Sequence, residues 1–300
     1  MPSDSLLDAL RKLVTNELPT AIPPNTSFIV GLNPSSGARS PKLWNAAYDE
    51  FGIDGRMFPL DVSEENLASL ISLLESDQRV NGVAVAAPYK SNVAELLHPR
   101  LTAAAARCGS VNLLSRDSDG RLSGCNTDGL AAVESLREVR PNLAKSRVLI
   151  LGCGGTGRAI VSELLNEIGS NQMIVAIRSD TGSFWLRNLG IATTRFDVDE
   201  SELERIDIVV NCTTVGWGNC SDSSPMQQHR IQQLNPECLV FDVVYQPDPT
   251  VFLKLAAEQN LSTLSGSRMN LLQAAFGFCL VNSDAKLPLV AETMREATSK

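Results

Sequence analysis

The hydrophobic and polar positions follow two alternating patterns along the chain. Short runs rich in Val, Ile and Leu, typical of buried strands, are followed by segments in which apolar residues recur at helical spacing. This alternation predicts an α/β fold with a mostly parallel sheet flanked by helices. The expected strands are Ser27–Gly31, Asp54–Pro59, Gly82–Ala86, Arg147–Leu151, Met173–Ile177, Ile208–Asn211, Leu239–Val244 and Leu261–Leu264. The expected helices are Leu43–Phe51, Asn66–Glu75, Asn92–Leu97, a helix that ends at about Ile168, Thr250–Gln259 and Met269–Leu280.

The length of the chain favours two domains. Its 300 residues exceed the size at which a single hydrophobic core usually keeps growing. Arg137–Ser146, which contains Pro141 and several charges, is the expected linker. Residues 1–21 carry charged side chains among leucines, which favours an amphipathic helix over a signal peptide.

The composition argues against several functional classes. A net charge of −8 without clustered Lys or Arg disfavours a nucleic-acid partner. No apolar run approaches the roughly 20 residues of a membrane-spanning helix. The seven scattered cysteines lack the spacing of a zinc site or a disulfide scaffold, so we expect reduced thiols and no metal. Because residues 1–21 do not resemble a signal peptide, we expect a cytoplasmic location. The expected partner is a small molecule, bound by a monomer or a homodimer.

A glycine-rich turn is the strongest local motif. Gly152-Cys153-Gly154-Gly155-Thr156-Gly157 follows an expected strand and begins an expected helix, which is the context of a dinucleotide-binding turn. The first glycine permits the tight turn, the second lets the backbone approach a pyrophosphate, and the third allows the helix to pack closely on the strand. The free N–H groups of the helix N-terminus favour the phosphates. The motif therefore predicts a bound dinucleotide.

The end of the next strand bears on the choice of nucleotide. There, about 20 residues after the turn, the chain reads Arg178-Ser179-Asp180, where an acidic residue would bind the ribose of NAD. Arg178 with Ser179 suits a 2′-phosphate, because guanidinium donors match phosphate oxygens, whereas Asp180 suits a free 2′-hydroxyl. We expect NADP, with NAD as the alternative.

Two charged residues are candidates for acid/base chemistry. Lys90 follows the expected strand Gly82–Ala86, at a strand end where open α/β folds build their clefts, and Asp128 lies in a short polar turn further along the chain. An ammonium group can donate a proton to a carbonyl oxygen as hydride arrives at the carbon. The pair therefore suits the reduction of a carbonyl group, with Asp128 orienting Lys90 or the substrate hydroxyl.

At this point the sequence resembles the shikimate dehydrogenase family along nearly its whole length. The motifs occur in the order of the family. They are Arg39-Ser40-Pro41 with Asn45, Ala87-Pro88-Tyr89-Lys90, Ser110-Val111-Asn112, the Asn-Thr-Asp-Gly element within Gly124–Gly129, the glycine turn, Ile177-Arg178-Ser179, Asn211–Gly216, Asp242–Pro247 and Gly266–Gln273.

The resemblance implies a role for each matching residue. Lys90 is implied as the acid/base and Asp128 as its partner, and both Asn112 and Asp128 are implied to hold ring hydroxyls. The remaining implied substrate residues are Ser40, Tyr245 and Gln273. The implied cofactor residues are the glycine turn with Gly152, Gly154, Gly155, Thr156 and Gly157, then Arg158 near the pyrophosphate, Arg178 and Ser179 at the adenosine ribose, and Thr213 on a neighbouring loop; Asp180 remains the candidate for a free 2′-hydroxyl.

The resemblance also implies a domain organisation. An N-terminal α/β domain of residues 1–125 and 267–300 is expected to bind the substrate and carry the catalytic residues. A Rossmann-type, doubly wound domain of residues 126–266 is expected to bind NAD(P), and the final helix is expected to return to the first domain. The implied activity is the interconversion of a ring hydroxyl and a ketone in aromatic amino acid biosynthesis.

The chain departs from the family pattern around the expected substrate. Ala38 replaces the usual serine, Ala84 the usual asparagine and Ala86 the usual threonine. Each lost hydrogen bond to a charged group costs about 1.5–3 kcal/mol of binding. Either Arg39 or Arg268, where glycine is usual, is a candidate to bind a carboxylate instead.

These departures leave several functions open. Besides shikimate, the substrate can be quinate, an aminoshikimate or a carboxylate-free cyclitol. A nucleotide-binding regulator without turnover is the alternative from another class.

Overall fold

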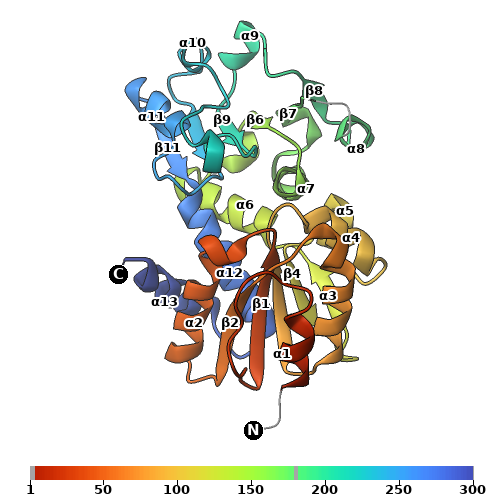
Figure 1. The fold of residues 1–300 in the computed structure, drawn as a ribbon. Helices are drawn as coiled ribbons and strands as arrows, with labels where there is room; N and C mark the ends of the chain where they lie inside the picture. The colour runs from red at the N-terminus through yellow and green to blue at the C-terminus, as the bar shows by residue number, and fades with distance from the viewer. Residues whose placement is uncertain (1–3, 179–181, 300) are drawn as a thin grey trace. The chain divides into compact units, whose positions relative to one another are not determined.

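The structure of the protein is a computed structural model, and it describes residues 4–178 and 182–299. The chain divides into two compact units. The first comprises Met1–Thr127 and Leu271–Lys300, and the second comprises Asp128–Asn270. Each unit is built around one sheet, and Figure 1 labels its elements.

The sheet of the first unit is mixed. Its strand order is β2-β1-β3-β4-β5. Strands β1 to β3 are parallel, whereas β4 is antiparallel to both β3 and β5. The strands are β1 (Asn25–Gly31), β2 (Gly55–Asp61), β3 (Val80–Val85), β4 (Leu113–Arg116) and β5 (Leu122–Cys125). The helices are α1 (Ser5–Leu10), η1 (Pro34–Ser36), α2 (Ser40–Glu50), α3 (Glu64–Ser76), α4 (Lys90–Leu97), α5 (Ala103–Cys108), the part of α12 (Gly266–Val281) from Leu271, and α13 (Leu287–Ser299).

The C-terminal helices complete the core of the first unit. Helix α13 packs against α2, and the blue C-terminal helices lie beside the red and orange elements in Figure 1. The buried ring of Phe278, on α12, lies 5.3 Å from the ring of Trp44 and 5.0 Å from that of Tyr48, both on α2. These edge-on contacts between buried rings favour close packing. The predicted return of the final helix to the first domain is confirmed.

The second unit has a fully parallel sheet of the order β11-β10-β9-β6-β7-β8. From β6 the sheet first grows through β7 and β8 on one side and then through β9, β10 and β11 on the other. This is the doubly wound strand order of dinucleotide-binding domains, so the predicted Rossmann-type fold is confirmed. Strands β6, β9 and β10 are buried along their whole length, as the continuous apolar runs predict. The strands are β6 (Val148–Leu151), β7 (Met173–Ala176), β8 (Ala192–Thr194), β9 (Ile208–Asn211), β10 (Leu239–Asp242) and β11 (Ser262–Ser265). The helices are α6 (Asp128–Val139), η2 (Leu143–Lys145), α7 (Gly155–Ile168), η3 (Ser170–Gln172), α8 (Ser183–Asn188), α9 (Glu200–Leu203), η5 (Gly218–Cys220), α10 (Gln228–Ile231) and α11 (Val251–Glu258).

Two sequence predictions about connections are wrong. The predicted linker Arg137–Ser146 lies inside the second unit, where α6 and η2 both pack against α7. The apolar face of α6 is buried there, which outweighs the charges and the proline of the segment. The N-terminal helix is also much shorter than expected, because α1 ends at Leu10 and the chain then continues without regular helix to β1.

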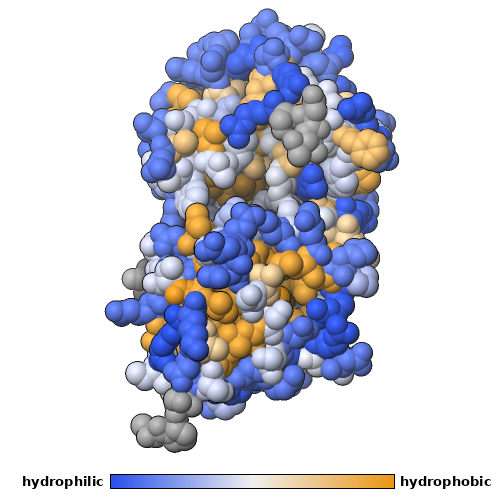
Figure 2. Space-filling view, turned by 45° about the vertical axis from the view of Figure 1, so that its right-hand side comes forward, coloured by the Kyte–Doolittle hydropathy of each residue, from blue (hydrophilic) through white to orange (hydrophobic). Residues whose placement is uncertain are grey.

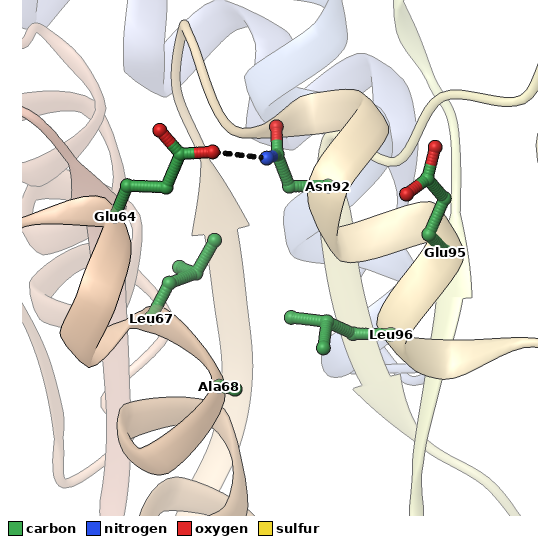
Figure 3. A pocket seen from close by; sticks show the side chains of 6 residues that line it. All are labelled: Glu64, Leu67, Ala68, Asn92, Glu95 and Leu96. Carbon is green, nitrogen blue, oxygen red and sulfur yellow. Dashed lines mark hydrogen bonds between the residues drawn. The ribbon is translucent and has the colours of Figure 1, made fainter.

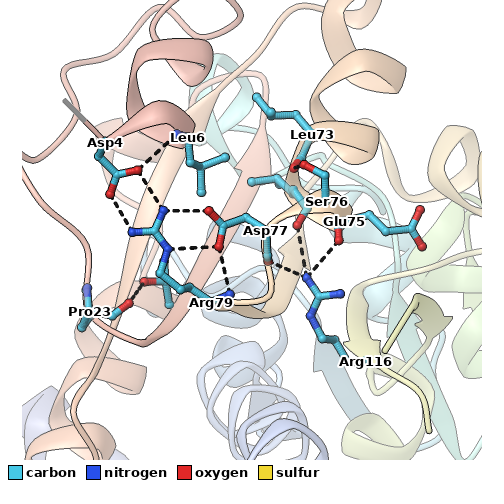
Figure 4. A network of polar contacts seen from close by, with 11 residues as sticks. Asp4, Leu6, Pro23, Leu73, Glu75, Ser76, Asp77, Arg79 and Arg116 are labelled. Atoms are coloured by element: carbon cyan, nitrogen blue, oxygen red, sulfur yellow. Dashed lines mark hydrogen bonds and ion pairs between the residues drawn. The ribbon is translucent and has the colours of Figure 1, made fainter. Parts of the chain in front are cut away.

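An ion-pair network holds the N-terminal segment to the first unit (Figure 4). The Arg79 guanidinium donates two hydrogen bonds to the Asp4 carboxylate, at 2.7 and 2.8 Å, and two to the Asp77 carboxylate, at 2.7 and 3.0 Å. The Asp4 carboxylate also accepts a bond from the Leu6 amide at the start of α1. Hydrogen bonding to Arg79 lowers the pKa of both carboxyl groups. The network therefore fixes the start of α1 against the turn that precedes β3.

The face of the protein shown in Figure 2 carries both hydrophilic and hydrophobic side chains. In the view of Figure 2, hydrophobic side chains appear in several patches among hydrophilic ones. Within residues 4–178 and 182–299, no helix combines the length and apolar character that crossing a membrane requires. Over the same residues, no group of three or more His, Cys, Asp or Glu side chains is arranged to hold a metal ion.

Candidate functional site

The glycine turn of the second unit has the geometry of a nucleotide cradle. Gly152, directly after β6, has a φ of +94°, a conformation that favours glycine. A Cβ at Gly157 would lie only 2.6 Å from the carbonyl oxygen of Gly152, so the third glycine is required by the packing of α7 on the turn. A Cβ at Gly154 would meet no atom within 4 Å, so the backbone there faces open space. The turn therefore fits a pyrophosphate that approaches at Gly154, with Gly155 and Thr156 at the N-terminus of α7.

A buried polar network fixes the loop beside this turn. Asn211, at the end of β9, donates a 2.8 Å bond to the Asp242 carboxylate and accepts bonds from the amide and hydroxyl of Thr213. Thr250 donates a further 2.7 Å bond to Asp242. Burial raises the pKa of Asp242 to about 6, although these hydrogen bonds act in the opposite direction. The network holds Thr213 against the turn, because a Cβ at Gly152 would lie 2.8 Å from the Thr213 methyl group.

Asp128 is held by the same turn. It is the first residue of α6 and is only 3% exposed. Its carboxylate accepts a 3.2 Å hydrogen bond from the Thr156 hydroxyl, at the start of α7. Helices α6 and α7 pack closely, since the backbone oxygen of Ala159 approaches Gly129 so nearly that a Cβ there would lie 2.3 Å away. The turn thus joins a candidate catalytic carboxylate to the candidate nucleotide site.

The remaining cofactor candidates lie along the same edge of the sheet. The guanidinium carbon of Arg158 lies 5.5 Å from the ring centre of Trp185, on α8, which is the distance of a cation–π contact. Arg178 is exposed and follows β7. The predicted Ser179 and Asp180 lie outside the described residues.

In the first unit, Lys90 and Asn112 lie at one edge of the sheet. Lys90 begins α4, after the turn that follows β3. Its backbone carbonyl accepts a 2.9 Å bond from the amide of Val111, next to Asn112. The Asn112 carbonyl in turn accepts a 2.8 Å bond from the amide of Val85, at the end of β3. The two predicted residues are 22 positions apart in the sequence, yet these backbone hydrogen bonds bring their main chains close to each other.

Asn112 also organises the residues around it. Its side chain donates a 2.9 Å bond to the Thr127 hydroxyl and accepts a 2.9 Å bond from the Thr127 amide. It makes a longer 3.5 Å contact with the side-chain oxygen of Gln273, on α12, and the Thr127 hydroxyl donates to the Gln273 backbone carbonyl at 3.1 Å. Three elements distant in the sequence therefore meet at these three polar side chains.

The other two predicted substrate residues are placed separately. Ser40 is the first residue of α2 and is buried. Tyr245 is half-buried after β10, in the second unit, whereas Ser40, Lys90, Asn112 and Gln273 belong to the first. Asp128 also begins the second unit, so its partnership with Lys90 stays a prediction.

Comparison with known proteins decides the family. A family model described as the shikimate dehydrogenase substrate binding domain matches residues 30–114. The shikimate dehydrogenase (NADP(+)) of Methanococcus maripaludis is 30% identical over 257 residues, which cover 83% of this chain and 90% of the relative. The chain belongs to the shikimate dehydrogenase family.

Solved structures of the same fold include enzymes with different substrates. The shikimate 5-dehydrogenase of Thermus thermophilus, in complex with NADP(H) and shikimate, has a TM-score of 0.77 at 26% identity and covers 91% of this chain and 99% of that one. The ligand-free 5-ketofructose reductase of a Gluconobacter strain has a TM-score of 0.73 at 25% identity, and the match covers 90% of this chain and 97% of that one. The fold is thus shared by proteins named for a cyclic acid and for a keto sugar.

The structure shows the surroundings of three residues that depart from the family pattern, Ala84, Ala86 and Arg268. Ala84 lies within β3 and Ala86 directly after it, beside Gly31 at the end of β1, so methyl groups stand where the family has polar ones. Arg268 is bound to Glu138 through its Nε, at 2.9 Å, and its Nη2, at 2.5 Å. The suggestion that Arg268 binds a substrate carboxylate therefore loses its support, because this guanidinium is already paired with a carboxylate. Arg39, directly before Ser40, keeps that role as a prediction.

Sequence reasoning missed the residues that position the predicted ones. In the sequence, Thr127, Asn211 and Asp242 stand out only as members of three separate family motifs, with no role of their own. A buried polar side chain that joins distant strand ends has no local signature. The one signal in the sequence was the placement of polar residues directly after apolar strands.

A groove elsewhere on the first unit is a poor candidate for this chemistry (Figure 3). It lies between α3 and α4, and Glu64 and Glu95 stand at its sides, with the Asn92 amide donating to Glu64 at 2.9 Å. Two carboxylates would repel an anionic nucleotide or acid. The groove also lacks the residues implied by the family.

Proposed function

We propose that the protein is an NADP-dependent dehydrogenase that interconverts a ring hydroxyl and a ketone on shikimate or a shikimate-like cyclic polyol. Residues 1–125 and 267–300 are proposed as the substrate-binding and catalytic domain, and residues 126–266 as the NAD(P)-binding domain. Membership of the family supports this function, as does the fold shared with an enzyme that binds NADP(H) and shikimate.

The proposed chemistry assigns one role to each charged residue. Lys90 acts as the general acid/base: its ammonium group donates a proton to the carbonyl oxygen in reduction and recovers it in oxidation. A bound nicotinamide nucleotide supplies or accepts the hydride. Asp128 accepts a hydrogen bond from Lys90 or from the reacting hydroxyl, while the Thr156 hydroxyl holds one oxygen of its carboxylate. Asn112, Ser40, Tyr245 and Gln273 are proposed to bind the remaining polar groups of the substrate.

One observation carries this proposal in the first unit. The backbone carbonyl of Lys90 accepts a hydrogen bond from the amide of Val111, the residue before the buried Asn112, and Asn112 is in turn bound to Thr127, which supports a site at this edge of the sheet. Buried, fully paired side chains hold a fixed geometry, which supports their use in orienting a substrate.

The cofactor is proposed to be NADP, with NAD as the alternative. The glycine turn, Arg158, Arg178 and Thr213 are the described residues that would hold it. The relatives named for NADP(+) and the Thermus complex with NADP(H) support this choice.

The experiment that tests the proposal is Lys90→Ala, with nucleotide reduction or oxidation followed by absorbance. We expect kcat to fall by about 10²-fold or more, with unchanged nucleotide affinity, because proton transfer and not cofactor binding is lost. The control is Lys286→Ala. This lysine is exposed and lies five residues after Val281, the last residue of α12. Val281 lies beside Gly82, near the start of β3, whereas Lys90 follows the end of that strand. A Lys90→Ala enzyme as active as the control would contradict the mechanism.

A panel of substrates decides between the alternatives. Shikimate and quinate come first, then an aminoshikimate, a carboxylate-free cyclitol and 5-ketofructose, each with NADP(H) and NAD(H). Ala38, Ala84 and Ala86 offer methyl groups in place of hydrogen-bonding groups, which favours a substrate with fewer polar groups at that position. Tight nucleotide binding with no turnover on any compound would instead identify a nucleotide-binding regulator.

We further propose that the enzyme works in the cytoplasm as a monomer or a homodimer, on a small molecule and not on nucleic acid. All seven cysteines are free thiols, which supports a reducing compartment. Light scattering of the purified protein at assay concentrations tests the oligomeric state.

A further inference from the structure

A buried carboxylate joins the end of β2 to the loop that follows β1. Asp61 is the last residue of β2, lies opposite Gly31 in the parallel pair with β1, and is only 5% exposed. Its carboxylate accepts a 2.8 Å hydrogen bond from the Ser35 amide through Oδ1 and a further bond from the Ser35 hydroxyl through Oδ2. Ser35 belongs to η1, within the loop 32–39 that leads from β1 to Ser40. Both oxygens of the carboxylate therefore hold this loop.

The backbone around Asp61 is held independently of its carboxylate. The Asp61 amide donates a 2.7 Å bond to the side chain of Asn16, and the Asp61 carbonyl accepts a 2.9 Å bond from the Thr15 amide. The amide of Val62 donates a 2.9 Å bond to the carbonyl of Gly31. Because these bonds use the backbone groups of the strand, they remain when the carboxylate is removed, and the carboxylate acts on the loop alone.

The same strand end also holds the turn that leads to Lys90. The hydroxyl of Tyr89, a buried side chain directly before Lys90, donates a 2.7 Å bond to the carbonyl of Val62, the residue after Asp61. Strands β1 to β3 are parallel, so their carboxyl ends lie at one edge of the sheet, where open α/β folds bind their ligands. The end of β2 therefore contacts both the loop before Ser40 and the turn before Lys90.

The loop and the turn approach each other at Gly31, the last residue of β1. A Cβ at Gly31 would lie 3.3 Å from the Cδ of Pro34, in the loop. It would also lie 3.0 Å from the Cβ of Ala86 and 3.6 Å from the carbonyl oxygen of Ala87, in the turn before Lys90. The absence of a side chain at Gly31 thus lets the two segments come close. A displaced loop would change the surroundings of this turn.

We infer that Asp61 is a positioning residue of the dehydrogenase: acting through Ser35, its carboxylate holds the loop 32–39 in the conformation that binds the substrate. The inference rests on the proposed function, which assigns Ser40 and Lys90 to the substrate. A loop that is ordered before the substrate arrives loses less conformational entropy on binding. Loss of the carboxylate should therefore weaken substrate binding without changing the proton transfer by Lys90.

The test is the steady-state kinetics of Asp61→Ala in the full-length protein, with the compound of the substrate panel that the wild type turns over fastest. We expect KM for this compound to rise about tenfold, with kcat within about twofold of the wild type and an unchanged Kd for the nucleotide. Asp61→Asn should restore most of the affinity, because its side chain accepts from the Ser35 amide and donates to the Ser35 hydroxyl. Amide hydrogen exchange, followed by mass spectrometry, should be faster in residues 32–39 of Asp61→Ala than in the wild type.

Two neighbouring serines provide a matched pair of variants. Ser35 and Ser36 are both exposed and both belong to η1, but the Ser36 hydroxyl donates a 3.0 Å bond to the Asn33 side chain and not to Asp61. Ser35→Ala should raise KM by about threefold, the effect of one lost hydrogen bond, whereas Ser36→Ala should leave it unchanged. Because Ser35→Ala removes only an exposed hydroxyl, it tests the inference even where Asp61→Ala fails to fold.

Three results would overturn the inference. They are a wild-type KM in both Asp61→Ala and Ser35→Ala, an equal effect of the two serine variants, and a loss of nucleotide affinity in Asp61→Ala as large as the loss of substrate affinity. The last would show a general structural role for the carboxylate. A wild-type protein that turned over no compound of the panel would instead overturn the proposed function, so the two failures are distinguishable.

Discussion

Asn112 and Thr127 bind each other twice, through a 2.9 Å bond from the Asn112 amide to the Thr127 hydroxyl and a 2.9 Å bond from the Thr127 backbone amide to the Asn112 side chain. Both residues are almost fully buried, with exposures of 4% and 3%. The pair lies at the edge of the sheet where Lys90 begins α4. Its geometry is rigid because each partner satisfies the other, and the Thr127 hydroxyl also binds the carbonyl of Gln273.

Thr127→Val tests this arrangement. The substitution keeps the shape of the side chain but removes the hydroxyl that accepts a bond from the Asn112 amide and donates one to the Gln273 carbonyl. We expect the free energy of unfolding to fall by about 1–3 kcal/mol, the cost of unpaired buried groups. Urea denaturation measures it, and Thr127→Ser, which retains the hydroxyl, is the control. Equal stability of the two variants would contradict a role for the hydroxyl.

In the glycine turn, two similar substitutions should affect different properties, one the stability of the fold and the other the binding of the nucleotide. Gly157→Ala places a methyl group 2.6 Å from the Gly152 carbonyl oxygen and should lower stability by about 1–3 kcal/mol, because backbone must shift. Gly154→Ala meets no protein atom and should change stability by less than about 0.5 kcal/mol, yet weaken nucleotide binding. Thermal unfolding and nucleotide titration of both variants provide the measurements. A Gly154→Ala protein with full nucleotide affinity would place the pyrophosphate elsewhere.

Asp242 should make the protein less stable as the pH rises from about 4 to 6. Burial raises its pKa in the folded protein to about 6, above the ordinary value of 3.8, so the folded state retains a proton that the unfolded state has lost over this range. Asp242→Asn removes this titration while keeping an oxygen for the Asn211 and Val244 donors. The unfolding free energy of the wild type, measured in urea, should fall relative to the variant between these pH values. Parallel curves would show that the carboxyl group does not titrate there.

Arg79 should produce the opposite dependence. It lowers the pKa of Asp4 and Asp77 below 3.8, so their ion pairs stabilise the fold above that pH and are lost as the pH falls through the lowered values. Arg79→Met should cost about 1–2 kcal/mol at neutral pH, a modest figure because these side chains are partly exposed, and less in acid.

The control for Arg79→Met is Arg11→Met, which breaks an ion pair with Asp8 whose two side chains are about half exposed. It should cost less than about 0.5 kcal/mol at either pH. A difference between Arg79→Met and the wild type that persists unchanged at pH 2 would show that packing, and not the ion pairs, explains the loss.

The sequence by itself determined the architecture of the second unit and most of its strands. A buried parallel strand is a local run of Val, Ile and Leu, and the glycine turn is a contiguous motif, so both can be read without knowledge of the fold. It failed where the local signal was weak: β4 and β5 are short and antiparallel, and the Pro and charges of Arg137–Ser146 suggested a linker inside a folded unit.

Only the tertiary structure decided which polar side chains meet. The pairing of Asn112 with Thr127 and Gln273, of Arg268 with Glu138, and of Arg195 with the backbone of Arg178 joins positions that are 15 to 161 residues apart or lie on different strands. Such contacts depend on strand order and helix packing, which are set by the burial of the whole apolar surface. Local spacing therefore predicts where the chain turns, and the packed core decides which residues those turns bring together.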